Sequence, residues 1–259
     1  MKYVMFSFDD GREDNYRVAY PILNKYRIRA TFHVVTGLID GSLNNGDKMF
    51  KSSSGKGMTI YQLKEMLRAG NEISSHGDLH TNSIENINAS LKKIQKWKLG
   101  KKGEIGFSSP NSDINVFNYG LYKNILNNGE IAYLRTGMNV RKYGIRITLL
   151  SLIEKYYHNN YFFYLINKLN IITKLGGFLL PSVSIKCETT INQIEYLLKK
   201  MPDNTAIILL FHSILNKNDR GYGCDAWYYD SGRFDSLCNN LATDRNIKLL
   251  TISEFLQRK

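Results

Sequence analysis

Cysteine, proline and tryptophan are scarce in this chain of 259 residues, which contains three, four and two of them. The cysteines Cys187, Cys224 and Cys238 lack the paired spacing of a metal site, and an odd, sparse number argues against a disulfide framework. The composition is otherwise ordinary, with no low-complexity tract and no internal repeat. The composition is that of a globular protein from a reducing compartment.

Long apolar runs are missing too. No stretch is long enough to cross a bilayer as a helix. The segment from Met1 to Phe6 meets the carboxylates Asp9 and Asp10 too soon to be a secretory signal. These two absences predict a cytoplasmic protein.

Acidic residues are outnumbered, because 35 Lys and Arg face 23 Asp and Glu. The net charge is +12 and the sequence pI is about 9.4. Such an excess favours anionic partners: nucleic acid, an anionic membrane face or a phosphorylated substrate. However, no short, dense block of Lys and Arg occurs. We therefore favour charges that are spread over a solvated surface, and we expect no nucleic-acid partner.

Short apolar runs alternate with helical patterns along the chain, and several runs end in polar, reactive residues. The predicted strands are 3–8, 30–35, 72–75, 105–108, 132–136, 206–211 and 248–252. The predicted helices are 15–26, 59–69, 84–99, 117–127, 189–200 and 233–241, and residues 37–57 are predicted to form a long loop. This alternation predicts a parallel sheet of the α/β class. The length fits one barrel-sized domain, with two small domains as the alternative.

The polar strand ends form a candidate site. The first strand stops at Asp9-Asp10-Gly11, where adjacent side chains point in different directions and can serve different purposes. His76 and His80 are four residues apart, a spacing that can place two imidazoles on one side of a metal ion. Asp10 is the candidate carboxylate that completes a three-ligand set and leaves positions open for water and substrate. His212 ends another predicted strand. In a barrel such ends converge on one face.

Three of these segments resemble motifs of the polysaccharide deacetylases with the NodB-type fold, carbohydrate esterase family 4. The segments are Ser7-Phe8-Asp9-Asp10-Gly11, His76-Gly77-Asp78-Leu79-His80 and Leu209-Leu210-Phe211-His212-Ser213. The resemblance implies a distorted (β/α) barrel with fewer than eight repeats. It also implies that residues 1–259 form a single NodB-like domain, with a mainly helical insertion at about 145–180.

The resemblance further implies roles for individual residues. One divalent metal, usually zinc, would bind Asp10, His76 and His80. Asp9 would be the general base and His212 the general acid. Amide hydrolysis needs both an activated water and a protonated leaving nitrogen, and we expect His212 to titrate near neutrality as that acid. For the substrate, the resemblance implies that Leu210 packs against the acyl methyl group and that the N–H of Asn111 donates to the oxyanion. Trp227 could stack on a sugar ring, with core packing or a lid as equal alternatives.

Two departures from the family pattern stand out. The third motif often carries an arginine before its proline, but here that region is Phe107-Ser108-Ser109-Pro110-Asn111. We hypothesise that Arg135, on the next strand, pairs with Asp9 instead; the alternative is a structural or rim arginine. Ser213 follows His212 where aspartate is common, which leaves Asp225 and Asp230 as candidates to tune His212. By contrast, we expect His33 to be a hydrogen-bonded core residue and His158 to be exposed.

The insertion bears on the substrate. A cytoplasmic enzyme would meet a sugar intermediate rather than a wall polymer, and a lipid-linked or nucleotide-linked N-acetyl amino sugar fits both the apolar insertion and the positive charge. Residues 145–180 could be a lid over the barrel mouth or could rest on an anionic membrane face, but an ordinary buried helix pair is favoured.

Three functions remain open at this point. The leading one is metal-dependent removal of an N-acetyl group from an amino sugar in a glycan or glycan precursor. The second is hydrolysis of another C–N bond, as in a formamide or cyclic imide. The third is an inactive glycan-binding barrel. Such a barrel would be expected to have lost at least one of the motif residues, which are Asp9, Asp10, His76, His80 and His212.

Overall fold

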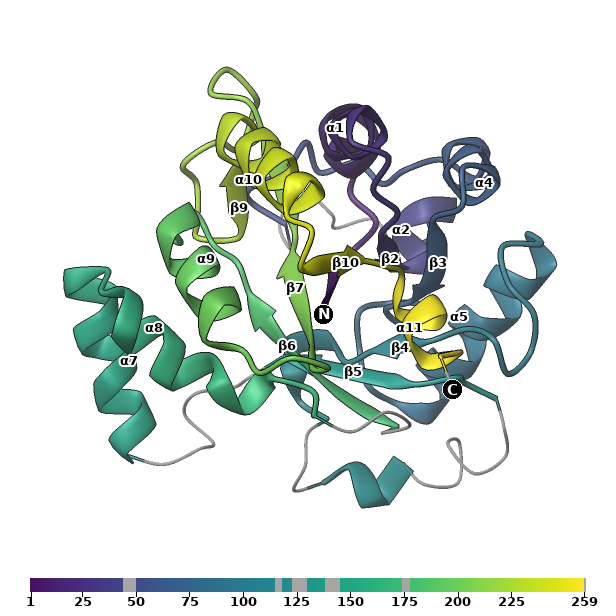
Figure 1. Cartoon of the computed structure of the whole chain (residues 1–259). Coiled ribbons are helices and arrows are strands. Elements are labelled where there is room, and N and C mark those ends of the chain that lie inside the picture. The colour runs from purple at the N-terminus through teal and green to yellow at the C-terminus, as the bar shows by residue number, and fades with distance from the viewer. Residues whose placement is uncertain (44–49, 115–117, 123–129, 138–144, 174–177, 259) are drawn as a thin grey trace.

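A computed structural model describes residues 1–258, except 44–49, 115–117, 123–129, 138–144 and 174–177. Seven parallel strands close into a barrel with helices around it (Figure 1). The barrel strands are β1 (Lys2–Phe8), β2 (Thr31–Val34), β3 (Glu72–Ser75), β4 (Phe107–Ser108), β5 (Leu134–Gly137), β6 (Leu179–Ser184) and β7 (Ala206–Phe211). The predicted fold, a distorted (β/α) barrel with fewer than eight repeats, is confirmed.

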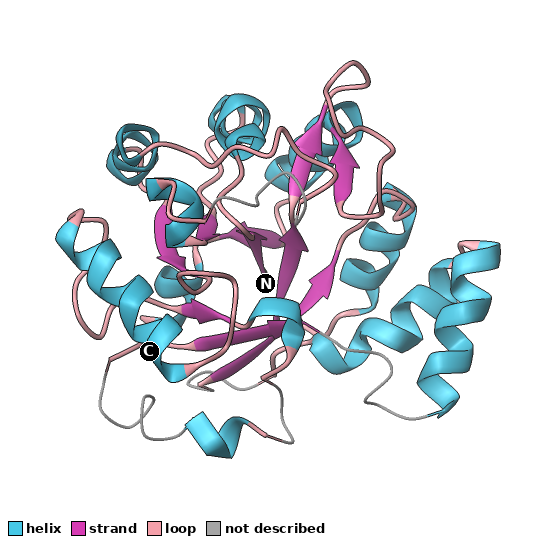
Figure 2. Cartoon of the chain, turned by 180° about the vertical axis from the view of Figure 1, so that it is seen from behind, coloured by secondary structure: helices cyan, strands magenta, loops and turns pink. Residues whose placement is uncertain are grey.

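The barrel closes between its first and seventh strands. Residues Tyr3 to Phe8 of β1 pair with Ala206 to Phe211 of β7 in parallel register. On its other edge β1 is shared: its first half pairs with β10 (Ile247–Leu249) and its second half with β2. A separate parallel pair, β8 (Ser213–Leu215) with β9 (Tyr228–Asp230), continues the chain beyond β7 and is visible in Figure 2 as two short strands apart from the barrel.

Helices surround the barrel in both views. They are α1 (Tyr20–Lys25, preceded by a π-helical turn at Asn15–Ala19), α2 (Thr36–Asp40), α4 (Ile60–Arg68), α5 (Ile84–Lys96), α7 (Ile145–Tyr157), α8 (Asn160–Asn167), α9 (Ile191–Lys200), α10 (Ser231–Thr243) and α11 (Ile252–Leu256). Thr59 caps α4 with Gln62 in a reciprocal capping box, as predicted.

Side-chain alternation along β1 divides the core into two parts. Phe6 and Phe8 face outward, where they meet Phe234 of α10 at ring-centroid distances of 5.9 Å. Met5 faces the barrel interior, in a cluster with Ile252 and Phe255 of α11. Because β-strand side chains alternate, Ser7 also faces inward, one step closer to the carboxyl end. The interior therefore changes from an apolar plug to a polar chamber along the barrel axis.

Some predicted elements differ from those observed. Residues 37–40 of the predicted loop belong to α2, and the predicted strand 248–252 ends at Leu249, with Ile252 already in α11. Strand β6 was not predicted; its first two residues were assigned to the insertion. Most of the predicted helix 117–127 lies outside the described residues, although Tyr119–Tyr122 forms a 3-10 turn.

The helical pair α7–α8 connects β5 to β6, and α8 packs against α9. Gln193 of α9 donates a hydrogen bond to Glu154 of α7 at 2.6 Å, and the rings of Tyr164 and Tyr196 pack edge to face. Both views show the pair outside the helical ring rather than across the strands. Among the described residues, no helix is both long and apolar enough to cross a membrane.

Candidate metal and catalytic site

The predicted site residues lie at the carboxyl ends of different barrel strands. Asp9 and Asp10 follow β1, His76 follows β3 and His212 follows β7, while Arg135 lies within β5. The carboxyl ends of parallel strands meet on one face of a barrel. All five side chains belong to residues with little or no exposure, except for His212, which is partly exposed.

The turn after β1 depends on two consecutive left-handed residues. Asp10 has φ +73° and Gly11 has φ +76°, a conformation that costs a residue with a Cβ but not glycine. A Cβ on Gly11 would also lie 2.9 Å from Cγ1 of Val34 in β2. This turn separates the directions of the two aspartates, so that Asp10 faces the histidines and Asp9 faces Arg135.

The loop from His76 to His80 is not helical, although α5 begins only four residues later. The side-chain oxygen of Asn86, in the first turn of α5, accepts hydrogen bonds from the N–H groups of Asp78 (2.7 Å) and Leu79 (3.0 Å). Gly77 has φ +82°, and a Cβ there would lie 2.8 Å from that same oxygen. The helix thus fixes the loop that carries both imidazoles.

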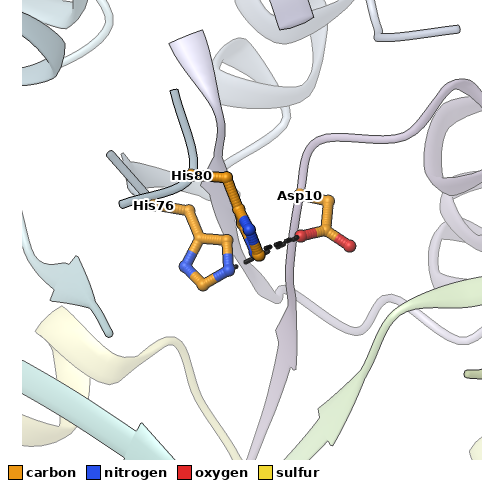
Figure 3. A group of neighbouring side chains, drawn as sticks. All are labelled: Asp10, His76 and His80. Carbon is orange, nitrogen blue, oxygen red and sulfur yellow. Dashed lines mark ion pairs between the residues drawn. The ribbon is translucent and has the colours of Figure 1, made fainter. Parts of the chain in front are cut away.

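Asp10, His76 and His80 form a three-ligand set for a divalent metal, with ligand atoms that all lie within 4.8 Å of one another. Oδ1 of Asp10 lies 3.5 Å from Nε2 of each histidine, as drawn in Figure 3. Ligand atoms about 2.1 Å from one tetrahedral ion are separated by about 3.4 Å. His76 donates its Nδ1–H to the carbonyl of Ser108 at 2.9 Å, which leaves Nε2 free to bind a metal.

Electrostatics keep Asp10 and His80 in their metal-binding forms. Burial, with the neighbouring His76, lowers the pKa of His80 to about 4, so its imidazole is neutral at pH 7. Burial alone would raise the pKa of Asp10, but the Arg12 guanidinium and nearby histidines outweigh it and hold the pKa below its ordinary value. Neutral imidazole and ionised carboxylate are the forms that bind metals.

The predicted pairing of Arg135 with Asp9 is confirmed. Nη2 of Arg135 lies 2.7 Å from Oδ1 and 2.5 Å from Oδ2 of Asp9, and the arginine is 1% exposed. Ser108 also contacts both side chains. Burial would raise the pKa of Asp9, but Arg135 and then the neighbouring histidines hold it well below the ordinary value. Asp9 is therefore ionised across the physiological range.

His212 differs from its prediction. Burial, opposed in part by the Asp10 carboxylate, lowers the pKa of His212 to about 4, so the expectation that it titrates near neutrality is wrong for the free protein. Its Nδ1 is buried without a hydrogen-bond partner among the described residues. The proposed tuning acids are engaged elsewhere: Asp230 caps α10, and Asp225 accepts the N–H of Trp227.

The three predicted substrate residues have different surroundings. Leu210 is buried in β7, in register with Ser7 of β1 and therefore on the inward face. Trp227 is 39% exposed, and its ring packs on His212 at a centroid distance of 4.7 Å. Asn111 follows β4 on the exposed side of a 3-10 turn, with φ +55°. Their substrate roles remain predictions.

Sequence reasoning missed two residues that support the site. Arg12 is buried and forms an ion pair with Asp10 at 2.6 Å, and Ser108 joins His76 to the Asp9–Arg135 pair. No motif signal marks either role; only the folded turn brings Arg12 back onto Asp10. His33 is the hydrogen-bonded core residue that was predicted, bonded to Ser7 and Tyr133, and His158 is exposed.

These features define the class of the protein: a NodB-type barrel with an Asp-His-His set beside a paired carboxylate. Residues 1–116 match the family model described as polysaccharide deacetylase. The resemblance predicted from the motifs is therefore confirmed over this N-terminal part of the chain.

A curated relative matches part of this chain. The chain is 35% identical over 102 residues, 39% of its length, to the poly-β-1,6-N-acetyl-D-glucosamine N-deacetylase of Staphylococcus aureus, in which the match covers 30% of the protein. The chain spans less than a third of the length of the curated relatives it matches.

Two solved structures share the fold at low identity. A family 4 acetyl xylan esterase from Clostridium thermocellum, solved with a cobalt ion, has a TM-score of 0.51 at 16% identity and covers 98% of this chain and 89% of its own. A 4-α-glucanotransferase from Thermococcus litoralis has a TM-score of 0.58 at 14% identity, and the match covers 100% of this chain and 40% of the glucanotransferase. Likeness at these identities concerns the barrel alone.

Proposed function

We propose that this protein is a metal-dependent hydrolase that removes an N-acetyl group from an amino sugar in a glycan or glycan precursor. The observation that carries the proposal is the convergence of the Asp10, His76 and His80 set with a carboxylate held by a buried arginine. The match of residues 1–116 to the polysaccharide deacetylase model supports it, and the partly matching staphylococcal relative is named as an N-deacetylase of an N-acetylglucosamine polymer.

The chain's own residues divide the chemistry of amide hydrolysis. Zinc, held by Asp10, His76 and His80, would supply a polarised water and a charge that stabilises the oxyanion; the cobalt ion in the xylan esterase supports a divalent metal. Asp9 accepts the proton of the attacking water, and Arg135 keeps Asp9 ionised and fixes its direction.

The leaving nitrogen needs a proton, and His212 is the donor that we propose. Since His212 is neutral in the free protein at pH 7, it takes up that proton from solvent after the substrate binds and passes it to the leaving nitrogen. Leu210 packs against the acyl methyl group, the N–H of Asn111 donates to the oxyanion, and Trp227 stacks on the sugar ring beside His212.

Two measurements on purified protein test the proposal. The first is metal content: about one transition metal per chain in the wild type, lost in Asp10→Ala and His80→Ala, supports the ligand set. The second is release of acetate, with matching formation of free amine, from N-acetylglucosamine oligomers of β-1,6 and β-1,4 linkage. Asp9→Asn should reduce that rate by about 10²- to 10⁴-fold, the usual contribution of a general base.

The same measurements separate the alternatives. A wild type that binds metal but releases no acetate from any N-acetylated sugar points to hydrolysis of another C–N bond, for which formamides and cyclic imides are the next substrates to assay. A wild type that takes up no metal even after incubation with zinc points to an inactive glycan-binding barrel.

We also propose that the substrate is lipid-linked or nucleotide-linked and that α7–α8 contacts an anionic membrane face. Support comes from large exposed side chains on this pair, since Leu149, Leu152 and Tyr156 are 58%, 53% and 85% exposed, together with the net charge of +12. Flotation with anionic vesicles tests this contact. Binding should fall in a triple serine variant of these residues and persist in Tyr61→Ser, a control on α4.

The cytoplasmic location and the single-domain organisation remain predictions. Cell fractionation tests the first, and limited proteolysis of the purified chain tests the second.

A further inference from the structure

Arg12 is a buried cation that contacts both Asp10 and Ser213, the residue that follows His212. It is 3% exposed, and its Nε and Nη2 atoms lie 2.8 Å and 2.6 Å from Oδ2 of Asp10. Its third donor, Nη1, lies 2.9 Å from Oγ of Ser213 and 3.2 Å from the carbonyl of Ser52. The Phe50 ring covers the guanidinium at 4.9 Å. Each of the three guanidinium nitrogens thus has a specific partner.

The contact divides the two oxygens of the Asp10 carboxylate. Oδ2 receives a charge-assisted hydrogen bond from Nε of Arg12 and forms an ion pair with Nη2, whereas Oδ1 is the atom that faces His76 and His80 at 3.5 Å each. An oxygen that is hydrogen-bonded to a guanidinium and held in an ion pair with it has little remaining capacity to bind a second cation. Asp10 is therefore positioned to bind a metal as a monodentate ligand, through Oδ1 alone.

The other end of Arg12 reaches the segment that follows His212. The Ser213 hydroxyl accepts from Arg12, so its single proton is available to Oδ2 of Asp14 at 3.0 Å. Asp14 also accepts the N–H of Ile214 at 3.1 Å. These bonds form one buried chain, from Asp10 through Arg12 and Ser213 to Asp14, that connects the turn after β1 to the start of β8.

We propose that Arg12 is a positioning residue of this site: it restricts Asp10 to a one-oxygen ligand and ties that ligand to the segment carrying His212. The inference rests on the proposed function, because it concerns the ligand set that would hold the metal. It deepens that function by assigning a residue that the motifs do not mark.

The shape of the guanidinium matters as much as its charge. Arginine presents a rigid planar fork whose Nε and Nη2 donors approach one carboxylate together, while a third donor points away. Lysine carries the same charge on a flexible stem and cannot hold Oδ2 and Ser213 in this geometry. A cation close to a metal site also opposes metal binding. Arg12→Lys therefore removes the fork while it keeps the charge, and isolates the positioning effect.

The experiment compares wild type, Arg12→Lys and Arg17→Lys. Arg17 is the matched control, because it is 47% exposed and pairs with Asp219 away from the ligand set. Zinc affinity is measured by competition with a chromophoric chelator, and the coordination of bound Co²⁺ by its visible absorption spectrum. Arg12→Lys should bind zinc about 10- to 100-fold more weakly, the usual effect of losing a partner of a metal ligand. Its Co²⁺ spectrum should shift toward a higher coordination number as Asp10 offers both oxygens.

A second variant covers the case in which Arg12→Lys does not fold, as judged by circular dichroism. Arg12→Gln keeps one donor for Asp10 but loses both the fork and the charge, so its Co²⁺ spectrum should shift in the same direction. An affinity and spectrum equal to wild type in Arg12→Lys, or an unchanged spectrum in Arg12→Gln, would overturn the role of Arg12 while leaving the metal site intact. A wild type that binds no metal overturns the site itself, and with it both proposals.

Discussion

Removing Arg135 should destabilise the fold strongly, whatever the protein's substrate is. Arg135 is 1% exposed, and its guanidinium bonds to Asp9, Ser108 and Ser182. Because the site is buried, bulk water cannot supply the hydrogen bonds that are lost with this side chain. Among the described residues, the Asp9 carboxylate of Arg135→Met keeps Ser108 at 3.4 Å and two histidines at 3.7 Å and 3.8 Å. Breaking a buried ion pair from one side costs about 3–5 kcal/mol, a large share of a typical stability of about 5–15 kcal/mol.

The pH dependence gives this prediction a sign. In the wild type the pKa of Asp9 is held below its unfolded value of 3.8, so the stability from the pair is present above about pH 4 and is lost as pH falls through the folded pKa. Without Arg135, burial would instead raise the pKa of Asp9. The folded variant would then be most stable with Asp9 protonated. Its loss of unfolding free energy relative to wild type should therefore be larger at pH 7 than at pH 4.

Urea denaturation followed by tryptophan fluorescence measures these differences. The control is Arg29→Met, which removes an arginine 47% exposed in its ion pair with Glu254 and should cost about 0–1 kcal/mol. The double variant Asp9→Asn with Arg135→Met should recover part of the loss, because no unpaired charge stays buried. A single Arg135→Met variant within about 1 kcal/mol of wild type at pH 7 would refute the reasoning.

Three further outcomes can be measured on the same protein. A Cβ on Gly106 would lie 2.0 Å from Cζ of Tyr133, so Gly106→Ala should lose at least about 1–3 kcal/mol in urea denaturation, whereas Gly120→Ala, in open space, should not. Burial raises the pKa of Asp14 to about 7. The stability contributed by the protonated carboxyl is therefore present below the unfolded-state pKa of 3.8 and is lost as pH rises through 7. Asp14→Asn should remove this fall in stability, measured by urea denaturation. Zinc at 100 times its Kd should stabilise the wild type by about 2.7 kcal/mol, seen as a higher Tm, but not His80→Ala.

The elements that sequence predicted best were those with complete local signals. Helix α4 has its capping box, and β7 is a continuous apolar run. Strand β6 was missed because Pro181 stands inside it, and a proline that donates no backbone N–H argues against a central strand. Helix α11 did carry a signal, since Thr251 and Glu254 form a capping box, but the apolar run before it favoured an extended strand.

The site was predictable where a residue's role follows from its strand end. Asp10, His76 and His80 gather because their strands are parallel and close into a barrel. Arg12 was not predictable, because its reach to Asp10 depends on two consecutive left-handed residues that no spacing rule specifies. The pKa of His212 was missed for a related reason: burial within a folded chamber sets it, and the sequence around the histidine does not report that burial.

The pairing of β1 with the distant strands β7 and β10 affects how the chain folds during synthesis. Residues 2–8 find their partners at 206–211 and 247–249, roughly two hundred positions away along the chain. Contacts of such high sequence separation form late and slow folding. A growing chain would thus expose the β7-facing edge of its first strand until the distal segments leave the ribosome, and an unpaired edge is a template for aggregation. Nascent chains stalled before residue 206 should consequently depend on chaperones, whereas chains released after residue 249 should not.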